Sequence, residues 1–156
     1  MRTIEELIAT ALIFENLRAE QLGVIAGCGR EEHVAAGAFL LREGEAAERF
    51  FLIRRGSVAL EVHGPGRGAV TIETLHAGDA VGLSWLFEPY RWQLDARALE
   101  PCELIGFDGA CLRGKCEADP ELGYELMRRF AANLVARLQA TRLQLLDVYG
   151  DARASA

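Results

Sequence analysis

The sequence predicts an α+β protein that is mainly β: an eight-stranded β-roll, or jelly roll, with N-terminal helices and a long C-terminal dimerisation helix. Two short helical patterns open the chain, short apolar runs separated by glycine fill its middle, and one long helical pattern follows from Pro120. Regularly spaced short strands with turn residues between them are typical of a sandwich or barrel. A length of 156 residues favours one globular domain.

The first helical pattern has apolar residues at helical spacing from Ile4 to Ile13, and the second covers residues 19–28. We expect these helices to cap the roll. The strand-like runs are residues 32–34, 38–41, 50–53, 57–62, 70–75, 80–82, 92–98 and 102–108. Residues 63–68 read His-Gly-Pro-Gly-Arg-Gly, which predicts an exposed hairpin tip.

Residues 78–98 read GDAVGLSWLFEPYRWQLDARA and carry the clearest functional signal. They predict a strand start, then Gly82, a one-turn helix over residues 84–87, and a second strand. A helix this short leaves most of its N–H groups without intrahelical partners, and glycine permits close backbone approach. The segment therefore predicts a small anion-binding cassette between two strands.

The order and spacing of this segment resemble the phosphate-binding cassette of cyclic nucleotide-binding domains in the catabolite activator protein (Crp/Fnr) superfamily. The family pattern is G-D/E-x-F-G-E-x-x-L-L followed by R-S/T-A, and the matching residues are Gly78, Asp79, Gly82, Leu86, Arg97 and Ala98. Leu83 stands where the family has its ribose-binding Glu. The Arg-Ser/Thr-Ala positions hold Trp92, Gln93 and Leu94, and Arg91 lies one residue early.

The glycine spacing of residues 35–60 also resembles this family, so that the resemblance covers about residues 12–150. It implies a regulatory module in which the cassette and the long helix hold a nucleotide. It also implies that Thr141 and Arg142 lie where family members contact the nucleotide base across a dimer. The ligand-binding residues expected on this basis are Gly82, Leu83, Ser84, Arg91, Trp92, Gln93, Thr141 and Arg142.

The last helical pattern begins at Pro120 and is predicted to end at Gly150, with residues 151–156 as a disordered tail. One apolar row has the alternating spacing of a two-stranded coiled coil: Met127, Ala131, Leu134, Leu138, Thr141, Leu145 and Val148. A second row, Leu122, Leu126 and Phe130, is expected to face the roll. Because one helix packed on its own domain explains only one row, the pattern favours a parallel homodimer. Residues 1–119 and 120–150 are expected to form one domain.

The formal net charge is −6 and the isoelectric point is about 5.1. This acidic balance, without a basic cluster or a recognition helix, predicts no direct DNA binding. The start of the chain carries Glu5 and Glu6 where a signal peptide would be basic, and no apolar run approaches the length of a membrane span. We therefore expect a cytoplasmic protein with no membrane contact.

The four cysteines, Cys28, Cys102, Cys111 and Cys116, form no C-x-x-C pair and are expected to be free thiols in a reducing compartment. His33, His63 and His76 lie far apart in sequence, so neither a metal nor a cofactor is predicted.

Catalytic patterns are also missing from the sequence. Ser84 lacks a G-x-S-x-G context, and Asp79, Glu88 and Asp95 form no acid–base pair, so no enzyme is predicted. Asp79 is expected to brace a turn and Asp95 to point to solvent.

Two hypotheses remain open. In the first, the chain is a dimeric sensor that binds a phosphorylated small molecule, with poor affinity for cyclic AMP and cyclic GMP. In the second, it is a ligand-free dimeric scaffold that docks on a protein partner. Trp85 and Trp92 could stack on a base, or Trp92 could fill the cavity. The direction of the Arg91 side chain distinguishes these two hypotheses. A guanidinium at the cassette helix favours the sensor, and a guanidinium that points outward favours the scaffold.

Overall fold

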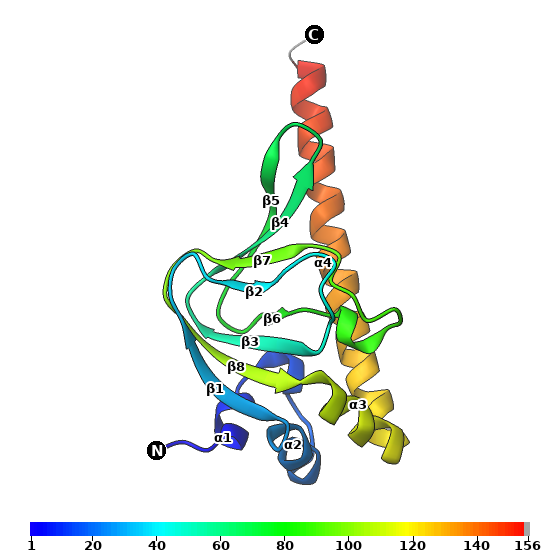
Figure 1. Ribbon diagram of the computed structural model, residues 1–156. Helices are drawn as coiled ribbons and strands as arrows, with labels where there is room; N and C mark the ends of the chain where they lie inside the picture. Colours follow the sequence, from blue (N-terminus) through cyan, green and yellow to red (C-terminus); the bar gives the residue numbers. More distant parts are fainter. Residues whose placement is uncertain (155–156) are drawn as a thin grey trace.

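The computed structural model describes residues 1–154 and confirms the predicted α+β class with an eight-stranded roll. Figure 1 shows the roll with small helices below it and one long helix along its side. In chain order, the elements are α1 (Ile4–Ile8), η1 (Leu12–Phe14), α2 (Ala19–Ala26), β1 (Gly29–Val34), β2 (Phe39–Leu41), β3 (Arg49–Arg55), β4 (Val58–Gly64), β5 (Gly68–Leu75), β6 (Ala80–Val81), η2 (Ser84–Leu86), β7 (Asp95–Ala98), β8 (Cys102–Asp108), α3 (Gly109–Ala118) and α4 (Pro120–Ala154).

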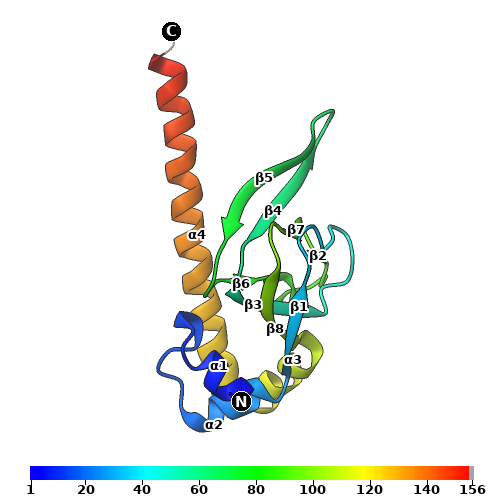
Figure 2. The same cartoon turned by 90° about the vertical axis from the view of Figure 1, so that its left-hand side faces the viewer.

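The strands form two antiparallel four-stranded sheets, with orders β1-β8-β3-β6 and β2-β7-β4-β5. The hairpin of β4 and β5 projects from the roll on the same side as the distal part of α4 (Figure 2). Strand β4 ends at Gly64 and β5 begins at Gly68, which confirms the predicted hairpin tip. Both strands extend further into the tip than expected.

The core has two parts because the roll buries one set of side chains between its sheets and another beneath its helices. Between the sheets lie Leu41, Phe51, Leu60, Val81, Trp92 and Leu104. Beneath the helices, the ring of Phe50 stacks on those of Phe107 and Trp85 at centroid distances of 4.5 and 4.7 Å. Phe130 of α4 meets Phe50 edge-on at 5.5 Å. This aromatic cluster fixes the start of α4 against the roll.

Helix α4 begins at Pro120, as predicted, and the carboxylate of Asp119 accepts a hydrogen bond from the Leu122 N–H at 3.3 Å. The row Leu122, Leu126 and Phe130 is buried against the core, which confirms its predicted direction. The predicted end at Gly150 is wrong. The helix continues through Gly150 to Ala154, which includes four residues of the predicted disordered tail, while residues 155–156 lie outside the described residues. Glycine weakens a helix by only about 1 kcal/mol and does not by itself end one.

The prediction of four free thiols is wrong for two cysteines. Cys28 and Cys111 form a disulfide with a Cα–Cα distance of 5.9 Å and a sequence separation of 83. Cys28 directly precedes β1 and Cys111 follows β8, so the antiparallel pairing of these strands brings the two residues together. Cys102 is free and buried, and Cys116 is free and half-buried.

Over residues 1–154, no helix is long and apolar enough to cross a membrane. The same residues contain no cluster of three or more histidine, cysteine or acidic side chains that could hold a metal ion.

Candidate ligand-binding site

A cavity of about 310 Å³ lies between the β-roll and α4. Strands β2, β4 and β5, the segment after β6, and the stretch before β7 form its walls on the roll side, and α4 closes it. The lining residues are Leu41, Leu60, Glu73, Gly82, Leu83, Ser84, Trp92, Gln93, Leu94, Leu134, Arg137, Leu138 and Thr141.

The cassette wall depends on Gly82, which follows β6 and has a φ of +94°. A Cβ at this position would lie 2.8 Å from the Trp92 ring, so both the backbone conformation and the space require glycine. The one-turn helix η2 follows, as predicted, and no side chain caps it. Its residue Trp85 is fully buried against Phe50, so only Ser84 of this turn faces the cavity.

Trp92 is only 7% exposed and packs in the core between the sheets while forming one wall of the cavity. Its backbone pairs with the loop after β2: the Trp92 N–H donates to the Glu45 carbonyl at 3.0 Å, and the Gly44 N–H donates to the Trp92 carbonyl at 2.9 Å. Strand β7 starts at Asp95. The predicted strand over residues 92–98 therefore began three residues too early.

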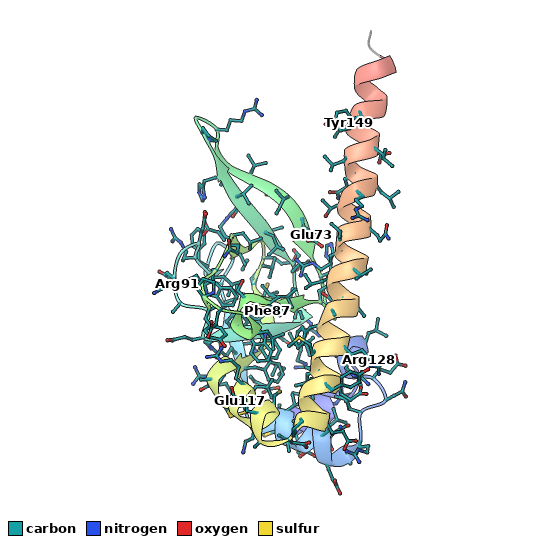
Figure 3. The ribbon with its side chains drawn as sticks, turned by 90° about the vertical axis from the view of Figure 1, so that its right-hand side faces the viewer. Glu73, Phe87, Arg91, Glu117, Arg128 and Tyr149 are labelled. Atoms are coloured by element: carbon teal, nitrogen blue, oxygen red, sulfur yellow. A yellow bond between two sulfur atoms is a disulfide. The ribbon has the colours of Figure 1, made fainter. Side chains whose placement is uncertain are left out.

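Arg91 points away from the cavity. Its side chain is exposed, and its Nη1 donates to the Gly44 carbonyl at 3.3 Å. Figure 3 labels Arg91 at the edge of the roll. Arg91 lines an adjoining hollow of about 280 Å³, which shares Leu83, Ser84, Gln93 and Leu134 with the cavity. Because an outward Arg91 side chain was expected for a ligand-free scaffold, this observation favours the scaffold hypothesis.

The structure brings six of the eight expected ligand-binding residues to one cavity, namely Gly82, Leu83, Ser84, Trp92, Gln93 and Thr141. Arg91 and Arg142 are absent from its lining. The hydroxyl of Thr141 donates to the Arg137 carbonyl one helical turn earlier, at 2.9 Å. Leu134 and Leu138, expected in a dimer seam, also line this cavity of their own chain.

Sequence reasoning missed two charged residues in this lining, Glu73 of β5 and Arg137 of α4. Their side chains form an ion pair in which Arg137 Nη2 lies 3.1 Å and Nε 3.3 Å from Glu73 Oε2. The pair is only partly exposed, and it ties α4 to the β4–β5 hairpin (Figure 3). One sequence signal was available, because Arg137 lies one helical turn before Thr141 and shares its helix face.

Two aspartates outside the cavity have structural roles. Asp79 accepts a hydrogen bond from the His76 N–H at 2.8 Å, which confirms that it braces a turn. The prediction that Asp95 points to solvent is wrong: its side chain is buried and accepts from the Glu43 N–H at 2.7 Å. Because β7 starts at Asp95, the strand alternation assumed from residue 92 does not apply there.

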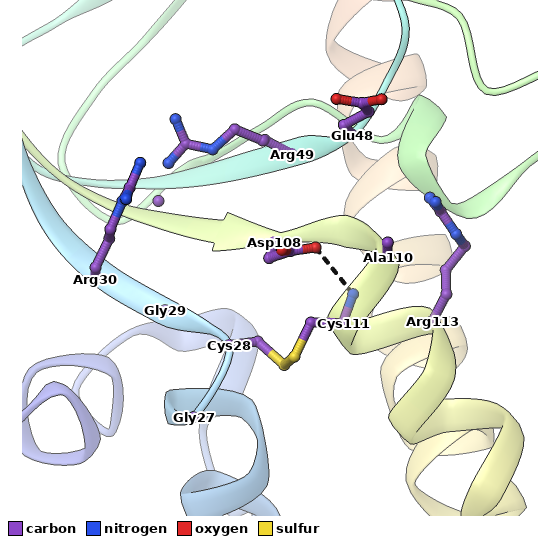
Figure 4. Close-up of a pocket in the computed structure, with 11 residues that line it drawn as sticks. Gly27, Cys28, Gly29, Arg30, Glu48, Arg49, Asp108, Ala110, Cys111 and Arg113 are labelled. Atoms are coloured by element: carbon purple, nitrogen blue, oxygen red, sulfur yellow. Dashed lines mark hydrogen bonds between the residues drawn. A yellow bond between two sulfur atoms is a disulfide. The ribbon is translucent and has the colours of Figure 1, made fainter.

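A larger hollow of about 610 Å³ lies at the opposite end of the roll, beside the disulfide (Figure 4). Its cations are already partnered. Arg49 and Arg30 both pair with Glu32. Burial raises the pKa of the Glu32 carboxyl, but the hydrogen bonds and charges of the two arginines together outweigh it, so the pKa is lowered. Arg113 donates to the Trp85 carbonyl and lies over the Tyr90 ring. The contacts of Arg113 hold α3 against the roll, and every arginine among the described residues that line this hollow has a partner.

The fold agrees with the family comparisons. The family described as "Cyclic nucleotide-binding domain" matches residues 31–119, which is more than half of the chain. The chain therefore belongs to the cyclic nucleotide-binding domain family. No curated protein sequence matches it.

Solved structures share the same architecture. A putative cyclic nucleotide-binding protein from Geobacter metallireducens is 30% identical, with a TM-score of 0.78 over 88% of this chain and 99% of that one. A cyclic nucleotide-binding domain from Methylobacillus flagellatus is 21% identical, with a TM-score of 0.78 over 92% and 80%. The catabolite activator protein of Thermus thermophilus is 21% identical, with a TM-score of 0.69 over 85% of this chain and 61% of its own. The latter two support the fold alone.

Proposed function

We propose that this chain is a dimeric sensor module that binds a small molecule other than an ordinary cyclic nucleotide and relays its occupancy through α4. The observation that carries the proposal is the shared cavity, since the cassette forms one wall and α4 the other. Leu134 and Leu138 belong both to this cavity and to the apolar row expected at the dimer seam. A bound molecule would therefore touch the helix face that meets the second copy.

The test of this proposal uses the neutral fluorescent probe N-phenyl-1-naphthylamine, whose fluorescence rises in apolar sites. We expect one probe per chain, and we expect amide hydrogen exchange in α4 to change when it binds. Ser84→Trp should block binding because the indole would enter the cavity. Gln139→Trp, on an exposed part of α4, should not. If the wild type binds no probe, the ligand-free scaffold becomes the better explanation.

The scaffold remains the second candidate because two observations favour it. Arg91 is turned outward, and Trp92 occupies space between the sheets where the family would place its phosphate-binding arginine. A cavity of about 310 Å³ nevertheless remains beside Trp92, and for this reason we prefer the sensor.

We expect the wild-type chain to be a homodimer and Leu145→Asp to shift it toward monomer. Leu145 is exposed in the single chain, it belongs to the predicted seam, and it lies beyond the cavity. A carboxylate buried in an apolar seam without a partner is strongly destabilising. Light scattering behind a sizing column measures the mass.

The matched control for the dimer is Gln139→Asp, which adds the same charge at an exposed position outside the seam. It should leave the dimer intact. A monomeric wild type at micromolar concentration would show that the two-row pattern of α4 has another cause.

We also expect this chain to retain duplex DNA no better than other acidic proteins of its size. A net charge of −6 repels the phosphate backbone, on which nonspecific DNA affinity depends. Fluorescence anisotropy with a labelled duplex at physiological salt measures this. Sequence-selective binding in the nanomolar range would contradict the expectation.

A further inference from the structure

We propose that Arg137 is the anion-binding residue of the cavity, and that the ligand is therefore a small amphipathic molecule with an apolar body and a single negative charge. The charge would displace Glu73 from Arg137. This inference rests on the proposed function, because it requires that the cavity binds a ligand. It assigns recognition of the charge to α4 instead of to the cassette.

The first argument is the placement of charge. Among the described residues that line the cavity, Arg137 is the one cation and Glu73 the one anion. Arg91, the arginine nearest to the family's phosphate-binding position in sequence, is outside this lining and bonded to the Gly44 carbonyl. Within the lining of the cavity itself, a negatively charged ligand therefore has one guanidinium available, and that guanidinium belongs to α4.

The second argument is that the Arg137–Glu73 contact can be exchanged. The two side chains are 21% and 27% exposed, so Glu73 can turn to water without being buried as an unpaired charge. Because both side chains keep some contact with water, neither charge is fully desolvated when the pair opens. A ligand carboxylate or sulfonate can take the place of the Glu73 carboxylate and accept the same two N–H groups from Arg137.

The third argument concerns the body of the ligand. Apart from the ion pair, the lining is dominated by apolar side chains, with Leu41, Leu60 and Trp92 on the roll and Leu134 and Leu138 on α4. Burial of apolar ligand surface against these walls supplies affinity, while one guanidinium compensates one charge. A dianionic phosphate monoester would keep a second charge without a partner and is disfavoured.

Replacement of Glu73 by the ligand would also change how α4 is held against the roll. Glu73 lies on β5, so the present ion pair links α4 to the projecting hairpin. When the ligand takes Arg137, this link between α4 and the hairpin is lost and α4 is held through the ligand. Occupancy would thus change what anchors the helix that is expected to form the dimer.

The experiment compares two fluorescent probes of nearly the same shape, neutral N-phenyl-1-naphthylamine and the monoanion 8-anilinonaphthalene-1-sulfonate. Both are titrated into the full chain at fixed ionic strength. Glu73→Gln should tighten sulfonate binding about tenfold, and Arg137→Gln should weaken it about tenfold, each corresponding to about 1.4 kcal/mol. Neither variant should change the affinity of the neutral probe more than about twofold, because the apolar walls are unaltered.

Matched controls make the same charge changes away from the cavity. Arg128→Gln and Glu121→Gln alter well-exposed side chains of α4 and should leave both probes unaffected. If the neutral probe binds but all variants show the same ratio of the two affinities, the assignment of Arg137 is wrong and the sensor proposal stands. If neither probe binds the wild type, both proposals are wrong.

Discussion

Cyclic AMP and cyclic GMP should bind this chain with dissociation constants near the millimolar range. Leu83 cannot accept the hydrogen bond from a ribose hydroxyl, and a polar group buried without a partner costs about 1–3 kcal/mol. Trp92 removes a charge-assisted contact to phosphate, which is roughly twice as strong as a neutral hydrogen bond. Since each 1.4 kcal/mol is about tenfold in affinity, the two losses convert a micromolar site into a millimolar one.

Titration calorimetry measures the dissociation constants of both nucleotides. Two double variants test whether binding is gained when the missing groups are added. Leu83→Glu with Trp92→Arg restores the family residues but removes a core side chain, so its folding must be verified by circular dichroism. Leu83→Glu with Gln93→Arg adds the same groups at cavity-lining positions and keeps Trp92. At least one of them should bind more tightly than the wild type. Micromolar binding by the wild type itself would show that the cassette uses other groups.

Removal of the disulfide between Cys28 and Cys111 should lower the free energy of unfolding by on the order of 4 kcal/mol. The bond closes a loop with a sequence separation of 83, and long loops lose much conformational entropy in the unfolded chain when they are crosslinked. It also joins the start of β1 to the first turn of α3 (Figure 4). Urea unfolding of Cys28→Ser/Cys111→Ser against the wild type measures the difference.

The control for the disulfide is Cys116→Ser, which removes a free, half-buried thiol and should change stability by less than about 1 kcal/mol. Burial raises the pKa of the Cys102 and Cys116 thiols, so both react slowly in the folded protein. Thiols must therefore be counted after denaturation without reductant. Two thiols per chain are expected, and a count of four would contradict the disulfide.

Local patterns in the sequence were sufficient for the architecture. All eight strands, α2, η2 and the start of α4 lie where the patterns predicted them, within a few residues, and the first helical pattern is divided into α1 and η1. Each depends on neighbouring residues, through strand alternation, helical spacing or turn glycines. The burial of Leu122, Leu126 and Phe130 follows in the same way from their spacing on one helix.

The contents of the candidate site depended on contacts between residues far apart in the chain. Arg137 pairs with Glu73, 64 positions away, and the buried carboxylate of Asp95 accepts a hydrogen bond from Glu43, 52 positions away. The loop after β2 turns Trp92 inward, and Arg91 outward to the Gly44 carbonyl. No local pattern contains these pairings.

The sequence by itself therefore determined the elements of this protein, its family resemblance and the region of the cavity. Tertiary structure decided which charges face that cavity and which cysteines are joined. The physical reason is that hydrophobic periodicity acts within a segment, whereas ion pairs, buried carboxylates and disulfides require two segments that only the packed roll brings within bonding distance.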